Sequence, residues 1–353
     1  MASLSIDSAK ILHNIRVVQD FCASRKMRLV GVVKSLQMIP TLVTLFQEAG
    51  IEALGISDVD IHTRLGKPLD GEPMLIKIPK PSQADTIVRN FRASLGSELV
   101  TIRALSEAAH RQRVTHELTL MIELGDLREG VLPGNALRHV REILEFSSPY
   151  LRLVGLGANL ACCHGTLPSV ENLAVLDEIA TEAERRLGHR FDKVSVGGSV
   201  MLDWLEKHAA PPRINELRVG EAIVLGTIPG SDRRHPALLQ DAFVLKGTVV
   251  EVKDKATAPL PEAGTAGRGR EPLGRAVPGK RAIVDLGYIN TVPRGLKCMD
   301  EHVRHVCSTS DYSVFDVTDC PRQLAPGDEI EFIPDYRAMT QSLMSPYVAR
   351  EIV

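Results

Sequence analysis

The stretch Met27–Ser57, MRLVGVVKSLQMIPTLVTLFQEAGIEALGIS, holds two apolar runs separated by an amphipathic segment. The runs Leu29–Val33 and Ala53–Ile56 are short and rich in branched residues, which predicts buried strands. Between them, Ile39–Gly50 has apolar residues at intervals of three and four, the spacing of a helix with one buried face. The stretch therefore predicts a strand, a helix and a second strand, the repeating unit of an α/β fold.

The same alternation of strands and helices continues along the chain. Asn172–Gly188 is a second clear helical segment, and Gly188 suits its end because glycine readily adopts the left-handed conformation. An amphipathic segment, Ser8–Ala23, precedes the first strand. Eight strands with helices between them predict a (β/α)8 barrel, the TIM-barrel architecture. The candidate strands are Leu29–Val33, Ala53–Ile56, Met74–Ile78, Glu98–Val100, Leu118–Glu123, Leu153–Ala158, Lys193–Val196 and Glu216–Val219.

The pattern changes near Asp241, where long alternating runs appear without comparable helices between them. This change predicts an all-β C-terminal domain, with the barrel over residues 1–235 and the β domain over residues 236–353. The segment Lys255–Lys280 is rich in glycine, proline and charge, and predicts a long mobile loop of a kind that is often functional. The candidate strands of this domain are Phe243–Val252, Arg281–Leu286, Ser313–Val317 and Glu329–Ile333.

Composition favours a small-molecule partner. The net charge of −2 leaves no basic field for nucleic acid or an anionic membrane. The first residues lack the basic and apolar segments of a signal peptide, and no apolar run is long enough to cross a bilayer. Six scattered cysteines are typical of free thiols in the cytoplasm. The adjacent residues Cys162, Cys163 and His164 would ligate one ion poorly, so no metal site is expected.

Active sites of β/α barrels lie at the carboxyl ends of the strands. Lys34 directly follows the first candidate strand, where a partly desolvated amine suits Schiff-base chemistry. The alternative is an ordinary lysine that extends from the strand end into solvent. Arg128, after the fifth strand, is a candidate anion-binding group, although a loop with internal ion pairs would have the same residues. Asn159 interrupts an apolar run and either bonds a ligand or is a satisfied buried amide.

Two glycine-rich turns follow the last two strands of the predicted barrel. Glycine allows the backbone to approach an anion, and a serine can cap the following helix and bond a phosphate oxygen. Each turn alone is common in β/α proteins, and an arginine there is often only a salt-bridge partner. Together with Lys34 they favour a phosphorylated cofactor held covalently by lysine. The residues concerned are Gly197, Gly198 and Ser199 in the first turn, and Arg218, Gly220 and Glu221 in the second.

These motifs resemble the alanine-racemase fold type of pyridoxal-phosphate enzymes along nearly the whole chain. VVKS at Val32–Ser35 resembles the family's cofactor-lysine motif. LRVGEAIVLG at Leu217–Gly226 resembles the motif whose arginine bonds the pyridine nitrogen and whose glycine leads a phosphate-binding turn. LVGLGANL at Leu153–Leu160 resembles the sixth-strand motif, with Asn159 where alanine racemases usually have histidine.

Within this family the chain most resembles the ornithine-racemase branch. The similar segments are ELGDLREG at Glu123–Gly130, VSVGGS at Val194–Ser199 and SDYSVFDVTD at Ser310–Asp319. The resemblance implies an isomerase that racemises ornithine or a similar basic free amino acid, with pyridoxal 5'-phosphate as cofactor. It also implies a homodimer with shared active sites, because the β domain normally completes the site of a second subunit.

The resemblance assigns roles to individual residues. Lys34 would carry the cofactor and exchange the α-proton on one face, and Arg128 would bind the substrate carboxylate. Tyr336 would reach the cofactor from the β domain, and Ser310 and Asp311 would contact the substrate. The remaining cofactor-binding residues are Asn159, Gly197, Gly198, Ser199, Arg218, Gly220 and Glu221.

The family's second catalytic tyrosine is missing, since the segment Glu251–Lys280 contains no tyrosine. Cys307 is a candidate for the second face because CSTSD at Cys307–Asp311 resembles a decarboxylase motif, but it also reads as a structural residue. Tyr288 and Tyr336 are alternatives. Two other functions stay open, namely an amino-acid decarboxylase of the same fold and a non-catalytic pyridoxal-phosphate homeostasis protein. The latter are single barrels, so the predicted β domain argues against them.

Overall fold

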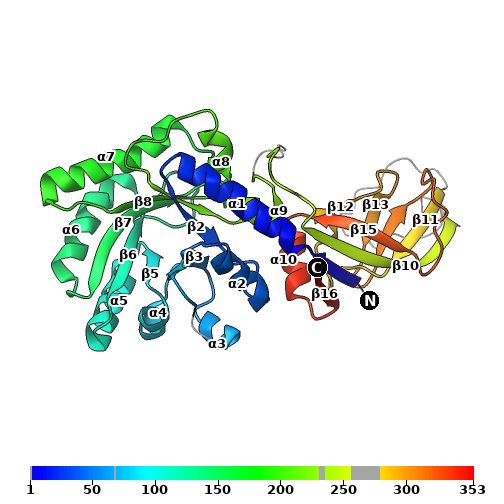
Figure 1. Cartoon of the computed structure of the whole chain (residues 1–353), viewed down its shortest axis with the longest axis horizontal. Coiled ribbons are helices and arrows are strands. Elements are labelled where there is room, and N and C mark those ends of the chain that lie inside the picture. Colours follow the sequence, from blue (N-terminus) through cyan, green and yellow to red (C-terminus); the bar gives the residue numbers. More distant parts are fainter. Residues whose placement is uncertain (1, 67–68, 230–234, 256–278) are drawn as a thin grey trace, which may run out of the picture. The chain divides into compact units, whose positions relative to one another are not determined.

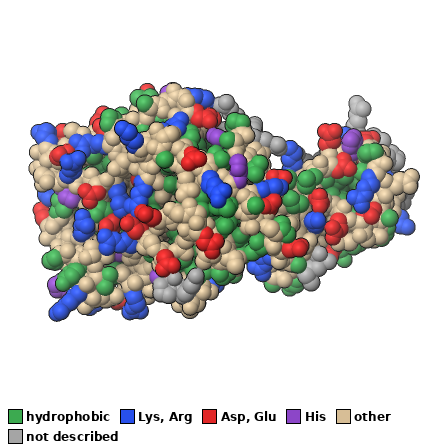
Figure 2. Space-filling view, in the orientation of Figure 1, with side chains coloured by type: hydrophobic (Ala, Val, Ile, Leu, Met, Phe, Trp, Pro, Cys, Tyr) green, Lys and Arg blue, Asp and Glu red, His purple; other side chains and the backbone are tan. Residues whose placement is uncertain are grey.

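The computed structural model describes residues 2–66, 69–229, 235–255 and 279–353 (Figure 1). Contacts divide the chain into two compact units. One, the barrel unit, is Lys10–Leu239, and the other, the β unit, combines Met1–Ala9 with Gln240–Val353. On the face drawn in Figure 2, basic and acidic side chains are intermingled. No helix in the described part of the chain is long and apolar enough to cross a membrane.

The barrel unit is a closed barrel of eight parallel strands, as the sequence predicts. Closure comes from β2, which pairs with β3 on one side and with β9 on the other. The strands are β2 (Arg28–Val32), β3 (Ala53–Ile56), β4 (Glu72–Leu75), β5 (Ala93–Gly96), β6 (His116–Met121), β7 (Leu151–Asn159), β8 (Lys193–Gly197) and β9 (Glu216–Val219).

Helices follow the strands and lie around them in Figure 1. The longest, α7, starts with a capping box in which Ser169 Oγ accepts from Asn172 N, and it ends at Gly188 with φ 62°, as predicted. The helices described in this unit are α1 (Ser8–Ser24), which starts two residues before the unit does, α2 (Pro40–Glu48), α3 (Ile61–Leu65), α4 (Ala84–Asn90), α5 (Leu99–Gln112), α6 (Ala136–Phe146), α7 (Val170–Leu187), α8 (Val200–Leu205) and α9 (Glu221–Leu225), with 3-10 turns at Pro81–Gln83 and Pro133–Asn135.

The predicted fourth strand, Glu98–Val100, is wrong. The strand is β5, and α5 already begins at Leu99. The four residues of β5, ASLG, are all buried, but they are small and only one is strongly apolar. The sequence pattern of these four residues therefore gives little indication of a strand. Their extended conformation is stabilised by pairing with β4 and β6.

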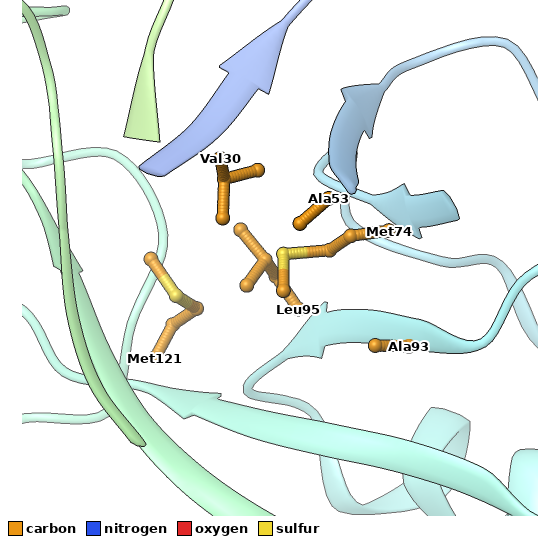
Figure 3. Close-up of a cluster of buried hydrophobic side chains, with 6 residues drawn as sticks. All are labelled: Val30, Ala53, Met74, Ala93, Leu95 and Met121. Atoms are coloured by element: carbon orange, nitrogen blue, oxygen red, sulfur yellow. The ribbon is translucent and has the colours of Figure 1, made fainter. Parts of the chain in front are cut away.

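The interior of the barrel is filled by side chains. In Figure 3, side chains from neighbouring strands meet in one cluster, in which two alanines leave room for two methionines. A barrel packed in this way has no central channel, so a ligand must bind at its rim. The cluster consists of Val30, Ala53, Met74, Ala93, Leu95 and Met121.

Ion pairs occupy the amino-terminal end of the barrel. The carboxylate of Glu117, near the start of β6, lies 2.7 Å from Arg92 Nη2 and 2.8 Å from Lys193 Nζ. Arg28, the first residue of β2, lies 2.6 Å from Glu72. These charged groups pair with one another at strand starts, the end of a β/α barrel associated with stability rather than with catalysis.

The β unit contains a mainly antiparallel eight-stranded sheet with the path β12-β15-β10-β11-β14-β13; β1 pairs with β10, and β16 pairs with β1. Among the described strands of this unit, β1 and β16 alone pair in parallel. The predicted all-β domain is therefore confirmed. Its elements are β1 (Ala2–Ile6), β10 (Phe243–Lys255), β11 (Gly279–Val284), a 3-10 turn (Pro293–Gly295), β12 (Leu296–Cys298), β13 (Arg304–Ser308), β14 (Ser313–Asp316), β15 (Glu329–Pro334), α10 (Tyr336–Met344) and β16 (Val348–Ile352).

The limits of the units differ from the predicted division at residues 235 and 236. The amino-terminal residues belong with the β unit because β1 pairs with both β10 and β16. At the other limit, the barrel unit extends to Leu239. The predicted loop Lys255–Lys280 lies outside the described residues at positions 256–278.

His116 provides a test of the packing between β5 and β6. Its buried ring bonds Ser94 Oγ at 2.8 Å and Phe91 O at 3.1 Å, and burial lowers its pKa from the ordinary 6.5 to about 4. Between these values the unfolded chain binds a proton that the folded chain does not. The free energy of unfolding should therefore fall as pH drops from 6.5 towards 4, by up to about 1.4 kcal/mol per pH unit.

Urea unfolding of the wild type and His116→Gln at several pH values measures this contribution. The stability difference between the two proteins should shrink as pH falls through this window. A difference that stays constant with pH would contradict a neutral buried His116.

Candidate functional site

Lys34 lies at the carboxyl end of β2, two residues after the strand, and is exposed. Its turn is fixed by Gln37, whose side-chain amide donates to Lys34 O at 2.5 Å. The Gln37 side-chain oxygen accepts from the backbone amides of Ser57 and Asp58 after β3, at 3.0 and 2.7 Å. Gln37 thus ties together the turns that follow two neighbouring strands. No local pattern in the sequence marks Gln37, because Ser57 and Asp58 lie twenty and twenty-one positions further along the chain.

Arg218, on β9, is 4% exposed and points to groups on the two preceding strands. Its Nη1 donates to Ser195 Oγ at 2.6 Å, and its Nη2 donates to Ala158 O at 2.6 Å and to Asn159 Oδ1 at 3.0 Å. Burial lowers the pKa of Arg218 to about 10, so it stays cationic at neutral pH. The rim therefore holds a buried positive charge with a fixed orientation.

The end of β8 leaves no space for a side chain at its last residue, Gly197. A Cβ on Gly197 would collide with Asn159 Oδ1 and lie 2.6 Å from Arg218 Nη2. Gly198 has φ 117°, a conformation that favours glycine, and its amide donates to Arg218 O at 3.1 Å. Glycine at these two positions lets the turn approach the arginine closely.

Ser199 was expected to cap its own helix, and this expectation is wrong. It is the residue before α8, but its side chain makes no capping bond there. Ser199 Oγ instead accepts from Ala222 N, in the first turn of α9, at 3.0 Å. The hydroxyl therefore joins the turn after β8 to the turn after β9.

The turn after β9 is also tightly packed, although its contacts are longer than those at Gly197. A Cβ on Gly220 would lie 3.0 Å from Val32 Cβ and 3.1 Å from Val32 O, and Val32 is two residues before Lys34 in the chain. The carboxylate of Glu221 accepts from Thr227 Oγ1 at 3.0 Å, so its backbone amide is the better candidate for binding an anion. Amides in the first turn of a helix have no acceptor within that helix, and both α8 and α9 begin at this rim.

Arg128 lies in the loop after β6, which is organised by Glu123. The carboxylate of Glu123 accepts from the amides of Leu127 at 3.1 Å and Arg128 at 3.2 Å. Arg128 pairs with the adjacent Glu129 through Nε and Nη2, the latter at 2.6 Å from Oε1, and this hydrogen bond raises the pKa of Arg128. Asn159 Nδ2 donates to the same Glu129 oxygen. Glu129, which sequence analysis did not select, thus bridges Arg128 and Asn159.

The other predicted residues lie in the β unit. Cys307 is half-buried on β13, while Ser310 and Asp311 are exposed in the turn before β14. Tyr288 is exposed, and hydrogen bonds from Tyr288 N to Thr309 O and from Ile289 N to Ser310 O, both 3.0 Å, hold its loop against this turn.

Tyr336 begins α10, a helix capped by Asp335, whose side chain accepts from Ala338 N at 2.7 Å. The roles of Cys307, Ser310, Asp311 and Tyr336 beside the barrel stay predictions.

The barrel rim fits a phosphorylated, lysine-bound cofactor. A lysine amine is exposed at one strand end, and a buried guanidinium is fixed by three hydrogen bonds. Two turns have glycine where a side chain would collide with neighbouring groups, and each turn leads into a helix. Lys34 would hold pyridoxal phosphate covalently, and the two turns would bind its phosphate.

Substitution of Gly197 tests how closely this rim is packed. Gly197→Ala should lower the free energy of unfolding by about 1–3 kcal/mol, because the new methyl group must displace Asn159 and Arg218. Gly134→Ala is the matched control, since a Cβ there would meet no atom within 4 Å. Urea unfolding of both variants makes the comparison, and equal stabilities would contradict the close approach at Gly197.

Comparison with known proteins is consistent with this geometry. A family model described as alanine racemase, N-terminal domain, matches residues 6–227. The chain is 29% identical to the ornithine racemase of Acetoanaerobium sticklandii, with 99% of each chain covered. It is 31% identical to the lysine racemase of Thermotoga maritima, with 98% of this chain and 97% of that protein covered.

Solved structures show the same fold. An alanine racemase from Streptomyces lavendulae superposes with a TM-score of 0.75 at 19% identity, covering 100% of this chain and 97% of that one. An alanine racemase from Bartonella henselae with covalently bound pyridoxal phosphate gives 0.74 at 15% identity, covering 100% and 99%. With a family model that matches more than half of its length, the chain belongs to the alanine racemase N-terminal domain family.

Proposed function

We propose that this protein is a pyridoxal-phosphate-dependent racemase of basic free amino acids such as ornithine or lysine. The observation that carries the proposal is the buried Arg218 at the same barrel rim as Lys34, with glycine turns beside both. Family membership supports the cofactor and the reaction. The two relatives named ornithine racemase and lysine racemase, each aligned over almost the full chain, support the substrate class.

When bound, pyridoxal phosphate withdraws the electron pair that is left at the substrate α-carbon after proton removal. Lys34 Nζ removes or returns the α-proton on one face. Arg218 would bind the ring nitrogen, and because a guanidinium donates hydrogen bonds but accepts none, it would leave that nitrogen unprotonated. Arg128 binds the α-carboxylate by charge and hydrogen bonding.

The second face needs its own acid and base group. We assign Cys307 to it, with Tyr288 and Tyr336 as alternatives, and we place Ser310 and Asp311 near the substrate. These residues would come from the partner subunit of a homodimer in which each β unit completes the other's site. The proximity of Tyr288 to the Cys307–Asp311 turn within the β unit supports a common role for that loop cluster.

Two further assignments belong to the proposal. A cytoplasmic location is supported by the six cysteines, all of which are free thiols. A decarboxylase of the same fold remains the second candidate, favoured by the CSTSD segment that begins at Cys307. Decarboxylation releases carbon dioxide from the substrate and racemisation does not, so the products separate the two reactions.

The direct test is a panel of L- and D-amino acids followed by chiral chromatography. The purified protein should interconvert both enantiomers of ornithine or lysine without release of gas. Lys34→Ala should abolish turnover, and borohydride followed by peptide mass spectrometry should find the cofactor on Lys34 in the wild type only. Wild-type turnover by the Lys34→Ala variant would remove Lys34 from this role, and release of carbon dioxide would favour the decarboxylase.

The second-face assignment is tested with Cys307→Ala, Tyr288→Phe and Tyr336→Phe. Cys307→Ala should slow racemisation in both directions yet keep the cofactor absorbance and the exchange of one enantiomer's α-proton with deuterated solvent. Mixed subunits of Cys307→Ala and Lys34→Ala should regain activity, because one site in each mixed dimer has both residues. If only a tyrosine variant is impaired, Cys307 is structural, and failure of complementation would argue against shared sites.

A further inference from the structure

Glu129 occupies a central place at the barrel rim that the mechanism above does not use. Its side chain is 12% exposed, while that of its partner Arg128 is 40% exposed. Both carboxylate oxygens bind donors, since Oε2 accepts from Arg128 Nε and Oε1 accepts from Arg128 Nη2 and from Asn159 Nδ2. A nearly buried carboxylate of this kind orders the groups that it binds.

The contact with Asn159 fixes which way that side-chain amide points. Asn159 donates through Nδ2 to Glu129 and accepts through Oδ1 from Arg218 Nη2 at 3.0 Å. A flipped amide would place its NH2 group against the guanidinium and its oxygen against the carboxylate, which loses both bonds. Glu129 therefore determines, through Asn159, one of the three hydrogen bonds that hold Arg218.

The contact with Arg128 fixes the direction of the second guanidinium. Glu129 takes the edge formed by Nε and Nη2. The edge formed by Nη1 and the second hydrogen of Nη2 has no partner among the described residues, and a carboxylate can bind there with two parallel hydrogen bonds. The positive charges of Arg128 and Arg218 repel each other, and the negative charge of Glu129 offsets this repulsion.

We infer that Glu129 is a positioning residue that couples the arginine for the substrate carboxylate to the arginine that faces the cofactor. The linked chain is Arg128, Glu129, Asn159 and Arg218, drawn from the loop after β6, the end of β7 and the middle of β9. This inference rests on the proposed function. Without Glu129, the orientations of the Arg128 and Arg218 guanidinium groups would be independent of each other. The inference also explains the asparagine at position 159, because its side chain has both the donor that Glu129 needs and the acceptor that Arg218 needs.

The test is a double-mutant cycle with Glu129→Gln and Asn159→Ala. Glutamine keeps the shape of the glutamate side chain and one acceptor oxygen. It loses the negative charge and can no longer accept hydrogen bonds from Arg128 through two oxygens. Two quantities are measured: the affinity of the apoprotein for pyridoxal phosphate by absorbance titration, and kcat and KM for both enantiomers of the substrate. Circular dichroism melting of each variant confirms that it is folded.

Glu129→Gln should raise KM for both enantiomers about tenfold or more, with a smaller effect on kcat, because Arg128 loses its fixed direction. In the cofactor titration, the double variant should lose about fivefold less affinity than the product of the two single losses, as expected for residues in one hydrogen-bonded chain. Glu123→Gln is the matched control from the same loop. Its carboxylate binds backbone amides only, so its effect and that of Asn159→Ala should multiply.

The coupling would be overturned if the affinity losses of Glu129→Gln and Asn159→Ala simply multiplied in the double variant. An unchanged KM of the Glu129→Gln variant would also overturn it. The failure of the proposed function looks different. A wild type that binds the cofactor but racemises no amino acid would contradict the proposed reaction, while the titration would still decide the coupling. A wild type that binds no pyridoxal phosphate would overturn both.

Discussion

The positively charged guanidinium of Arg218 is almost completely buried, and the barrel rim provides hydrogen-bond acceptors for it. A buried cation is tolerated only where hydrogen bonds replace its hydration. Arg218 obtains them from the Ser195 hydroxyl, the Ala158 carbonyl and the Asn159 amide, on the two preceding strands. The carboxyl ends of β7, β8 and β9 are thereby joined around one group, and the orientation of that group is set before any ligand binds.

The glycine turns follow from the same constraint. The guanidinium and the Asn159 amide fill the space in front of Gly197, so that position accepts no side chain. The turn after β9 also lies close to Val32, and Ser199 joins it to the turn after β8. A rim held by bonds between turns as well as within them keeps several donors in fixed positions. Preorganised donors of this kind are what a charged ligand requires, because they need not be rearranged when it binds.

The two ends of the barrel use charge differently. At the amino-terminal end, three cations pair with three carboxylates, so the charges there are balanced locally; the cations are Arg28, Arg92 and Lys193, and the carboxylates are Glu72, Glu117 and Glu216. At the carboxyl end, Arg128 and Arg218 share Glu129 through a chain of hydrogen bonds, which leaves a net positive charge for an anionic group.

The sequence by itself determined the barrel, the β unit and the place of Lys34 and Arg218. Buried parallel strands need continuous apolar runs and their helices need one apolar face, so both are visible in a single sequence, and active-site residues at strand ends follow from the architecture. It did not determine β5, whose small residues have no strong period, or β1, whose partners β10 and β16 lie more than 200 residues away. Nor did it determine that Ser199 binds Ala222 or that Glu129 binds Asn159. Those contacts join segments at the carboxyl ends of different strands, and only the pairing of neighbouring strands in the barrel brings them within hydrogen-bonding distance.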